Sequence, residues 1–121
     1  MDKTAAPQQV SCEIEVTLSV IGGKYKPLIV YYLCEHSPKR FGELLRFLGR
    51  VSQKTLTNQL RELGRDGLVS RTVFAEVPPR VEYAITEKGR TLLPLLDLMC
   101  EWGEKHMGEG FVVTNPQCED E

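Results

Sequence analysis

The chain has 121 residues, of which 41% are hydrophobic and 26% are charged, with a formal net charge of -2. This length allows one hydrophobic core and is too short for two ordinary domains. The longest apolar run, residues 28–33, is far shorter than the roughly 20 residues of a membrane-spanning helix, and the start of the chain has no apolar signal segment, so we expect a cytoplasmic protein without a membrane partner.

Two helices are predicted in the first third of the chain, after a flexible N-terminal segment over residues 1–11. The first helix is short and stops at the glycine pair 22–23; its apolar residues have helical spacing: Ile14, Leu18 and Ile21. The second begins near Pro27, whose missing N–H costs little in a first turn, and ends before the Ser37-Pro38 pair. Because residues 27–35 carry little polar surface, we expect this helix to be the buried centre of the fold.

A sharp turn joins the third and fourth predicted helices. The third covers residues 41–48, where apolar residues recur at i, i+3, i+4 and i+7, and only residues 49–51 interrupt the pattern. In the fourth, Ser52 suits an N-cap and Gly67 a left-handed end. Its leucines cluster on one side, while four polar residues lie within about 60 degrees of one another on the opposite side: Lys54, Asn58, Arg61 and Arg65.

After the fourth helix, the sequence predicts a β-hairpin and one last helix. Residues 68–75 and 81–86 are alternating β-branched and aromatic runs, typical of two paired strands. Pro78 and Pro79 stiffen the tip, so we expect Arg80 to be displayed near its end. The last helix is predicted over residues 87–107, opened by Thr86 and bent at Pro94. A loose acidic tail over residues 108–121 completes the chain.

The apolar residues of the first and last helices exceed what a small core needs. Some of them could cover the core of this domain, but in so short a chain two such helices favour a core shared with a second copy. The residues that we expect at this dimer interface are Ile14, Leu18, Leu95, Met99 and Trp102.

Positive charge is concentrated around the fourth helix. Residues 39–71 contain eight Lys or Arg against three acids, a net charge of +5, whereas the remainder has seven against 14, a net charge of -7. The basic side chains can bind phosphates or guanine, Asn58 and Gln53 can make a two-point contact with adenine, and Thr57 can touch a phosphate or a thymine methyl. Two helices joined by a tight turn and followed by a basic hairpin therefore predict a winged helix-turn-helix that binds double-stranded DNA. The fold class is α+β, mostly α, with a two-stranded wing and a C-terminal dimerisation helix.

Residues 12–106 resemble the HxlR-type winged-helix transcriptional regulators. The resemblance lies in "IGGKY" at 21–25, "RFGELLR" at 40–46, "VSQKTLTNQLREL" at 51–63, "GLVSR" at 67–71, "VPPRVEYAIT" at 77–86, and "GRTLLPLL" at 89–96 followed by Trp102-Gly103. The resemblance also includes an early cysteine, Cys12, but Glu13 follows it where the family often has a proline. The chain departs from the family pattern at two more positions: Tyr25, where a tryptophan is usual, and Gly64, where an acid is common. None of these departures falls on the polar side of the fourth helix, which we expect to face DNA and call the basic stripe.

The resemblance implies a homodimer, built from the first and last helices, that binds a two-fold-related operator over one winged-helix domain at residues 12–107. Carried onto this chain, the DNA-facing residues that the family implies are Ser52, Gln53, Lys54, Thr57, Asn58 and Arg61, with Arg80 in the wing. We expect a repressor, because a dimer covering an operator can block polymerase without an activation surface. The competing hypothesis is an interaction module whose basic stripe binds an acidic protein.

Cys12 raises a further hypothesis, because in some regulators of this kind the equivalent cysteine senses oxidants or electrophiles. An inert thiol is the alternative, and the neighbouring Glu13 would slow the reaction of the thiol. A small molecule or an oxidant is thus a candidate effector. The two histidines, His36 and His106, have no ligand-spaced cysteine or aspartate beside them, and no catalytic motif is present, so we expect no metal, no cofactor and no enzymatic activity.

Overall fold

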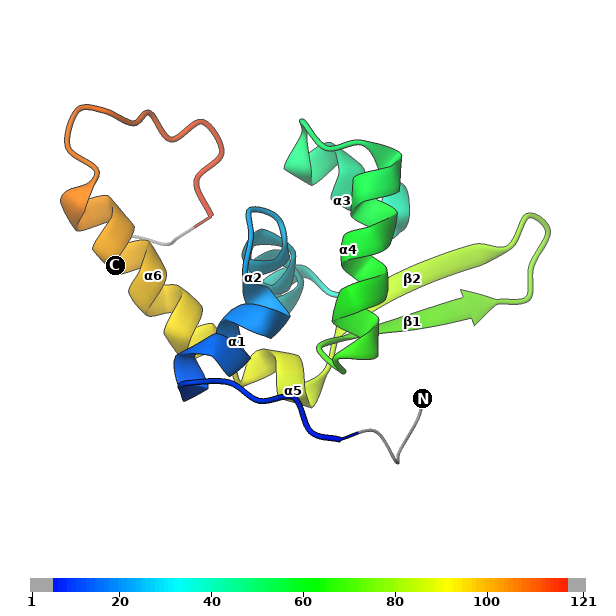
Figure 1. Cartoon of the computed structure of the whole chain (residues 1–121). Coiled ribbons are helices and arrows are strands. Elements are labelled where there is room, and N and C mark those ends of the chain that lie inside the picture. Colours follow the sequence, from blue (N-terminus) through cyan, green and yellow to red (C-terminus); the bar gives the residue numbers. More distant parts are fainter. Residues whose placement is uncertain (1–5, 118–121) are drawn as a thin grey trace.

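The computed structural model describes residues 6–117, which form helices around a central helix and one two-stranded wing (Figure 1). In chain order the elements are α1 Glu13–Ile21, α2 Lys26–His36, α3 Phe41–Leu48, α4 Gln53–Arg65, β1 Val69–Phe74, β2 Arg80–Ile85, α5 Glu87–Arg90 and α6 Leu93–His106. The predicted fold class is confirmed. In the described part of the chain, no helix combines the length and the apolar character that crossing a bilayer requires.

Helix α2 is the centre of the core, as its apolar sequence predicts. Its residues Ile29, Val30 and Leu33 have no exposed surface, and the helix contacts α1, α4, α5, α6 and β2. Proline lies in its first turn, where the absent N–H leaves no hydrogen bond unmade. Most of the other elements are therefore positioned by direct packing against α2.

The two strands of the wing pair antiparallel, with a register that runs from Val69 opposite Ile85 to Phe74 opposite Arg80. A backbone bridge anchors the wing to the helices: the Lys39 N–H donates to the Tyr83 carbonyl at 2.8 Å, and the Tyr83 N–H donates back at 2.7 Å. The hairpin extends away from the helices on the side of α4, while α6 lies on the opposite side of the molecule (Figure 1). The wing and the expected dimerisation helix are thus well separated.

The prediction of one bent last helix is wrong, because residues 87–106 form two helices. Thr86 opens α5 as expected, since its Oγ1 accepts a hydrogen bond from the Gly89 N–H at 2.9 Å. That helix ends at Arg90, and α6 begins anew with Pro94 in its first turn. A proline in a first turn loses no hydrogen bond, whereas in a helix interior it costs roughly 3 kcal/mol, so breaking the helix before Pro94 avoids this cost.

Both ends of the described chain lack helix and strand. Residues 6–11 precede α1, and the rest of the predicted flexible segment, residues 1–5, lies outside the described residues. After α6, residues 107–117 turn back toward α3, where the Asn115 side-chain amide donates to the Phe47 carbonyl at 3.2 Å. The sequence does not indicate this hydrogen bond. The last four residues of the predicted tail, 118–121, lie outside the described part of the chain.

Candidate nucleic-acid interface

The fourth helix begins and ends at the residues that the sequence predicts. Ser52 is the N-cap, and its Oγ accepts a hydrogen bond from the Thr55 N–H at 3.0 Å. At the other end Gly67 has a φ of +78°, a left-handed conformation that favours glycine. The Leu68 N–H then donates to the Leu63 carbonyl at 2.9 Å, a bond typical of helices that end in this way.

A lysine from α5 also holds the end of α4. The Lys88 ammonium donates to the Asp66 carbonyl at 2.9 Å, and its positive charge lies where the carbonyl groups of the helix terminus converge. The C-terminal end of α4 is therefore attached to α5 as well as to the wing.

Helix α4 buries one face and exposes the other. Leu56, Leu60 and Leu63 are at most 4% exposed and pack into the core. The residues of this segment that are predicted to face DNA are all solvent exposed: Ser52, Gln53, Lys54, Thr57, Asn58, Arg61 and Arg65. Within residues 6–117, Lys54 and Arg61 form no ion pair, so both cations are available to a ligand.

Arg80 lies in the wing, but its side chain is folded back onto the hairpin. Its guanidinium is 3.3 Å from both the Glu76 and the Glu82 carboxylates, and it covers the Phe74 ring at 4.1 Å from the centroid. The side chain is 29% exposed. The sequence predicts a displayed arginine, whereas these two carboxylates neutralise it: Glu82 lies two residues further along β2, on the same face of the strand, and Glu76 lies on the other side of the tip.

The residues expected at the dimer interface lie on the surface of the single chain. The exposed fractions of Ile14 and Leu18 in α1 are 67% and 59%. In α6, Leu95, Met99 and Trp102 are 38%, 49% and 66% exposed. Leu96, between them in sequence, is 4% exposed and belongs to the core. Helix α6 therefore uses one face for its own core and leaves another apolar face uncovered.

The cysteines lie in contrasting environments. Cys12 is an exposed free thiol at the N-cap position of α1, where an ordinary N-cap side chain would accept a backbone hydrogen bond and this one accepts none. Cys34 is buried in α2, and desolvation by this burial raises its pKa, which disfavours the reactive thiolate. Among the described residues, no three His, Cys, Asp or Glu side chains are grouped so that they could hold a metal ion.

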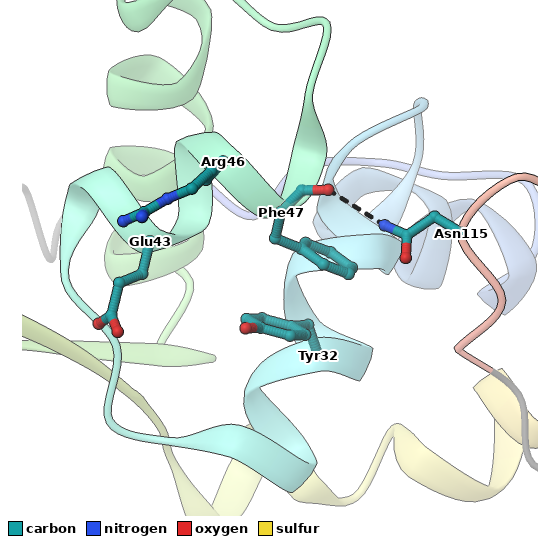
Figure 2. A pocket seen from close by; sticks show the side chains of 5 residues that line it. All are labelled: Tyr32, Glu43, Arg46, Phe47 and Asn115. Atoms are coloured by element: carbon teal, nitrogen blue, oxygen red, sulfur yellow. Dashed lines mark hydrogen bonds between the residues drawn. The ribbon is translucent and has the colours of Figure 1, made fainter.

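An open cavity of about 410 Å³ lies between α2, α3 and the C-terminal segment. Figure 2 shows its lining: the Tyr32 and Phe47 rings stack at 3.9 Å between centroids, flanked by Glu43, Arg46 and Asn115. None of the predicted site residues lines this cavity. The sequence could not indicate it, because Asn115 is brought to α3 from the far end of the chain.

Lys26 is a charged residue that sequence reasoning missed. It is 6% exposed, and its Nζ lies 2.5 Å from Oε1 of Glu62, which is in α4 beside Arg61. A lysine at the start of an otherwise apolar helix is a signal for a buried ion pair, because its charge needs a partner there. The sequence does not indicate which carboxylate is that partner.

An exposed polar face on the second helix of a helix-turn-helix, with a β-hairpin beside it, defines a winged-helix DNA-binding protein. The model of the HxlR-like helix-turn-helix family matches residues 20–111. The chain belongs to this family, and it is a DNA-binding transcriptional regulator.

The chain is similar to several known proteins and solved structures. An uncharacterised HTH-type transcriptional regulator of Halalkalibacterium halodurans is 54% identical over 90 residues, which cover 74% of this chain and 80% of that protein. YkvN of Bacillus subtilis, with the same description, is 44% identical over 115 residues, or 91% of this chain and 97% of that protein. The redox regulator HypR in its reduced form is 46% identical, with a TM-score of 0.77, and the match covers 83% of this chain and 100% of that one. Its oxidised form is 49% identical, with a TM-score of 0.74, over 78% of this chain and 97% of that one.

Proposed function

We propose that this regulator is a cytoplasmic homodimer that represses transcription by binding a two-fold-related operator, with α4 of each protomer in the major groove. The observation that supports it best is the exposed row of Lys54, Asn58, Arg61 and Arg65 on a helix whose leucines are buried. The buried face fixes which way the exposed row points. That row is the part of the chain that can enter a groove.

The polar residues of α4 divide by chemistry into two kinds of contact. Lys54 and Arg65, at the ends of the row, can neutralise phosphates, which contributes affinity without sequence preference. Arg65 also pairs with the neighbouring Asp66 carboxylate at 3.4 Å, and this exposed pair leaves the other guanidinium N–H groups for a phosphate. Arg61 and Asn58, near its middle, can make paired hydrogen bonds to guanine and to adenine, respectively. Gln53, Ser52 and Thr57 add contacts at the N-terminal end.

Homodimer formation is supported by the uncovered apolar face of α6 and by the exposed apolar residues of α1. An operator with two-fold symmetry matches a symmetric dimer, because each half-site then contacts the same surface. A dimer that covers such a site excludes polymerase, which is why we propose repression.

The test begins with duplexes selected by the wild-type protein from a random pool. Arg61→Ala should lower the affinity by roughly 1–3 kcal/mol and relax selection at one base position of each half-site. Lys54→Ala should weaken binding to all sequences alike and reduce the slope of log affinity against log salt by about 1 for each phosphate that is no longer neutralised. If the wild-type protein binds only weakly and without sequence preference, an interaction module for an acidic protein becomes the better description. Unchanged binding in both variants would exclude this face of α4 as the DNA-binding surface.

A second proposal concerns the signal to which the regulator responds. Cys12 is exposed, and similar proteins include a redox regulator in reduced and oxidised forms, so we propose that Cys12 is a thiol switch. Added hydrogen peroxide would oxidise two Cys12 thiols: its O–O bond breaks, its oxygens take up two electrons and the two thiol protons and leave as water, and the two sulfurs join the subunits through a disulfide. The expected result is a peroxide-induced dimer band on a non-reducing gel that is absent for Cys12→Ser and retained for Cys34→Ser. A band that persists in Cys12→Ser would refute the switch.

A further inference from the structure

The junction between α1 and α2 holds α4 through Tyr25 and Lys26, which we call the junction pair. The Lys26 ammonium is buried and lies 2.5 Å from Oε1 of Glu62, in the last third of α4. The Tyr25 hydroxyl donates to the Arg50 carbonyl at 2.9 Å, in the turn that leads into α4. Two adjacent residues of the junction therefore contact the helix-turn-helix at both ends of the recognition segment.

The ion pair is asymmetric, because one partner is buried and the other reaches solvent. The Lys26 side chain is 8% exposed, whereas that of Glu62 is 40% exposed. The hydrogen bond from Lys26, together with its charge, lowers the pKa of Glu62 and keeps this carboxylate ionised. A buried ammonium without a carboxylate would be costly, so the pair holds α4 at one position relative to α2.

Packing alone would fix the orientation of α4 less firmly. The contacts of Leu56, Leu60 and Leu63 with the core are non-directional, and they determine which face of the helix is buried. Hydrogen bonds and close ion pairs depend on distance and angle. Glu62 is next to Arg61 in sequence, so a rotation that breaks the ion pair also re-aims the arginine.

We propose that Lys26 and Tyr25 are positioning residues, which set the rotation of the recognition helix relative to the DNA without touching it. This inference rests on the proposed function, since it concerns how α4 is presented to an operator. The junction pair follows α1 closely, with only Gly22, Gly23 and Lys24 between them. The orientation of the recognition helix is thus tied to the segment that follows an expected dimerisation helix.

The test compares Lys26→Met with Lys105→Met, which removes the same charge from an exposed site in the last turn of α6. Methionine fills the space of the buried lysine chain, and Glu62 can be solvated, so the fold should survive. For Lys26→Met we expect the ratio of operator to random-DNA affinity to fall about tenfold, within the usual range for residues coupled in one network. The salt dependence of binding to random DNA should not change. Lys105→Met should leave both properties as in the wild-type protein.

Hydrogen exchange of the α4 amides provides a readout that needs no DNA. We expect these amides to exchange about tenfold faster in Lys26→Met than in Lys105→Met, while amides of α6 are unaffected. If the wild-type protein shows no sequence preference, the proposed function fails and the exchange data still decide whether Lys26 holds α4. If Lys26→Met does not fold, Tyr25→Phe, which removes only the hydroxyl, should show the same changes to a smaller degree. Unchanged selectivity and unchanged α4 exchange in a folded variant would overturn the proposal.

Discussion

Gly89 in α5 is a position where one added carbon should destabilise the whole domain. An alanine Cβ there would lie 2.4 Å from the Leu68 carbonyl oxygen and 2.6 Å from Cδ1 of Ile85. Both distances are too short, and one neighbour is backbone, so the helix or the start of the wing must move. Overpacking of this kind costs about 1–3 kcal/mol. Alanine has a better helix propensity than glycine, which offsets at most about 1 kcal/mol of this cost. At the upper limit of the overpacking cost, the free energy of unfolding therefore falls by about 2 kcal/mol.

Gly42 in α3 is the matched control, because an alanine Cβ at this exposed helical position has no neighbour within 4 Å. Gly42→Ala should raise the stability by up to about 1 kcal/mol. At a fixed protein concentration, the thermal midpoint of Gly89→Ala should fall by up to roughly 8 °C, and that of Gly42→Ala should rise by a few degrees. A Gly89→Ala midpoint equal to or above that of Gly42→Ala would refute the close packing of α5 against the wing.

Two further predictions concern the dimer and acid stability. Trp102→Glu places a charge on the exposed apolar face of α6 and should raise the dimer dissociation constant at least about 30-fold in sedimentation experiments. An unchanged dissociation constant would exclude this face as the dimer interface. Glu43 accepts a hydrogen bond from the Arg40 N–H at 2.8 Å, and this bond lowers the pKa of the carboxyl group. Because its pKa is lower in the folded state, Glu43 stabilises the domain above about pH 4.3, and this contribution is lost as pH falls further. Denaturant titrations of Glu43→Gln should therefore show a weaker loss of stability in acid than the wild-type protein, and an identical loss would contradict this role.

Local signals of the sequence predict most of the framework that carries the interface. The leucine spacing of α4, the N-cap Ser52 and the left-handed Gly67 are properties of neighbouring residues, so periodicity and capping rules place them correctly. The exposed row of α4 follows from the same periodicity, since burying the leucines leaves the opposite face in solvent. What this row contacts stays a prediction.

Features that depend on distant pairing could not be predicted in the same way. The ion pair of Lys26 with Glu62 joins residues 36 positions apart, and the hydrogen bond of Asn115 with Phe47 joins residues 68 apart. The folded-back Arg80 is a different case, because both of its partners are near it in sequence, and the alternation of side chains along β2 could have indicated Glu82 as a partner. At Pro94 the sequence indicates the right residue, but the predicted bend is wrong, because a proline can begin a helix as readily as it bends one.

The pairing of Arg80 also bears on how an acidic chain can approach DNA. In the wing tip one arginine faces two glutamates, so this part of the hairpin adds no net positive charge in the folded chain. We therefore expect the attraction to phosphates to come from other cations, among them Lys54 and Arg61 in α4, which have no carboxylate partner among the described residues. A modest error in the angle of α4 would misplace Lys54 and Arg61 together. We therefore predict that operator binding by this protein depends on how firmly α4 is held as well as on the total charge.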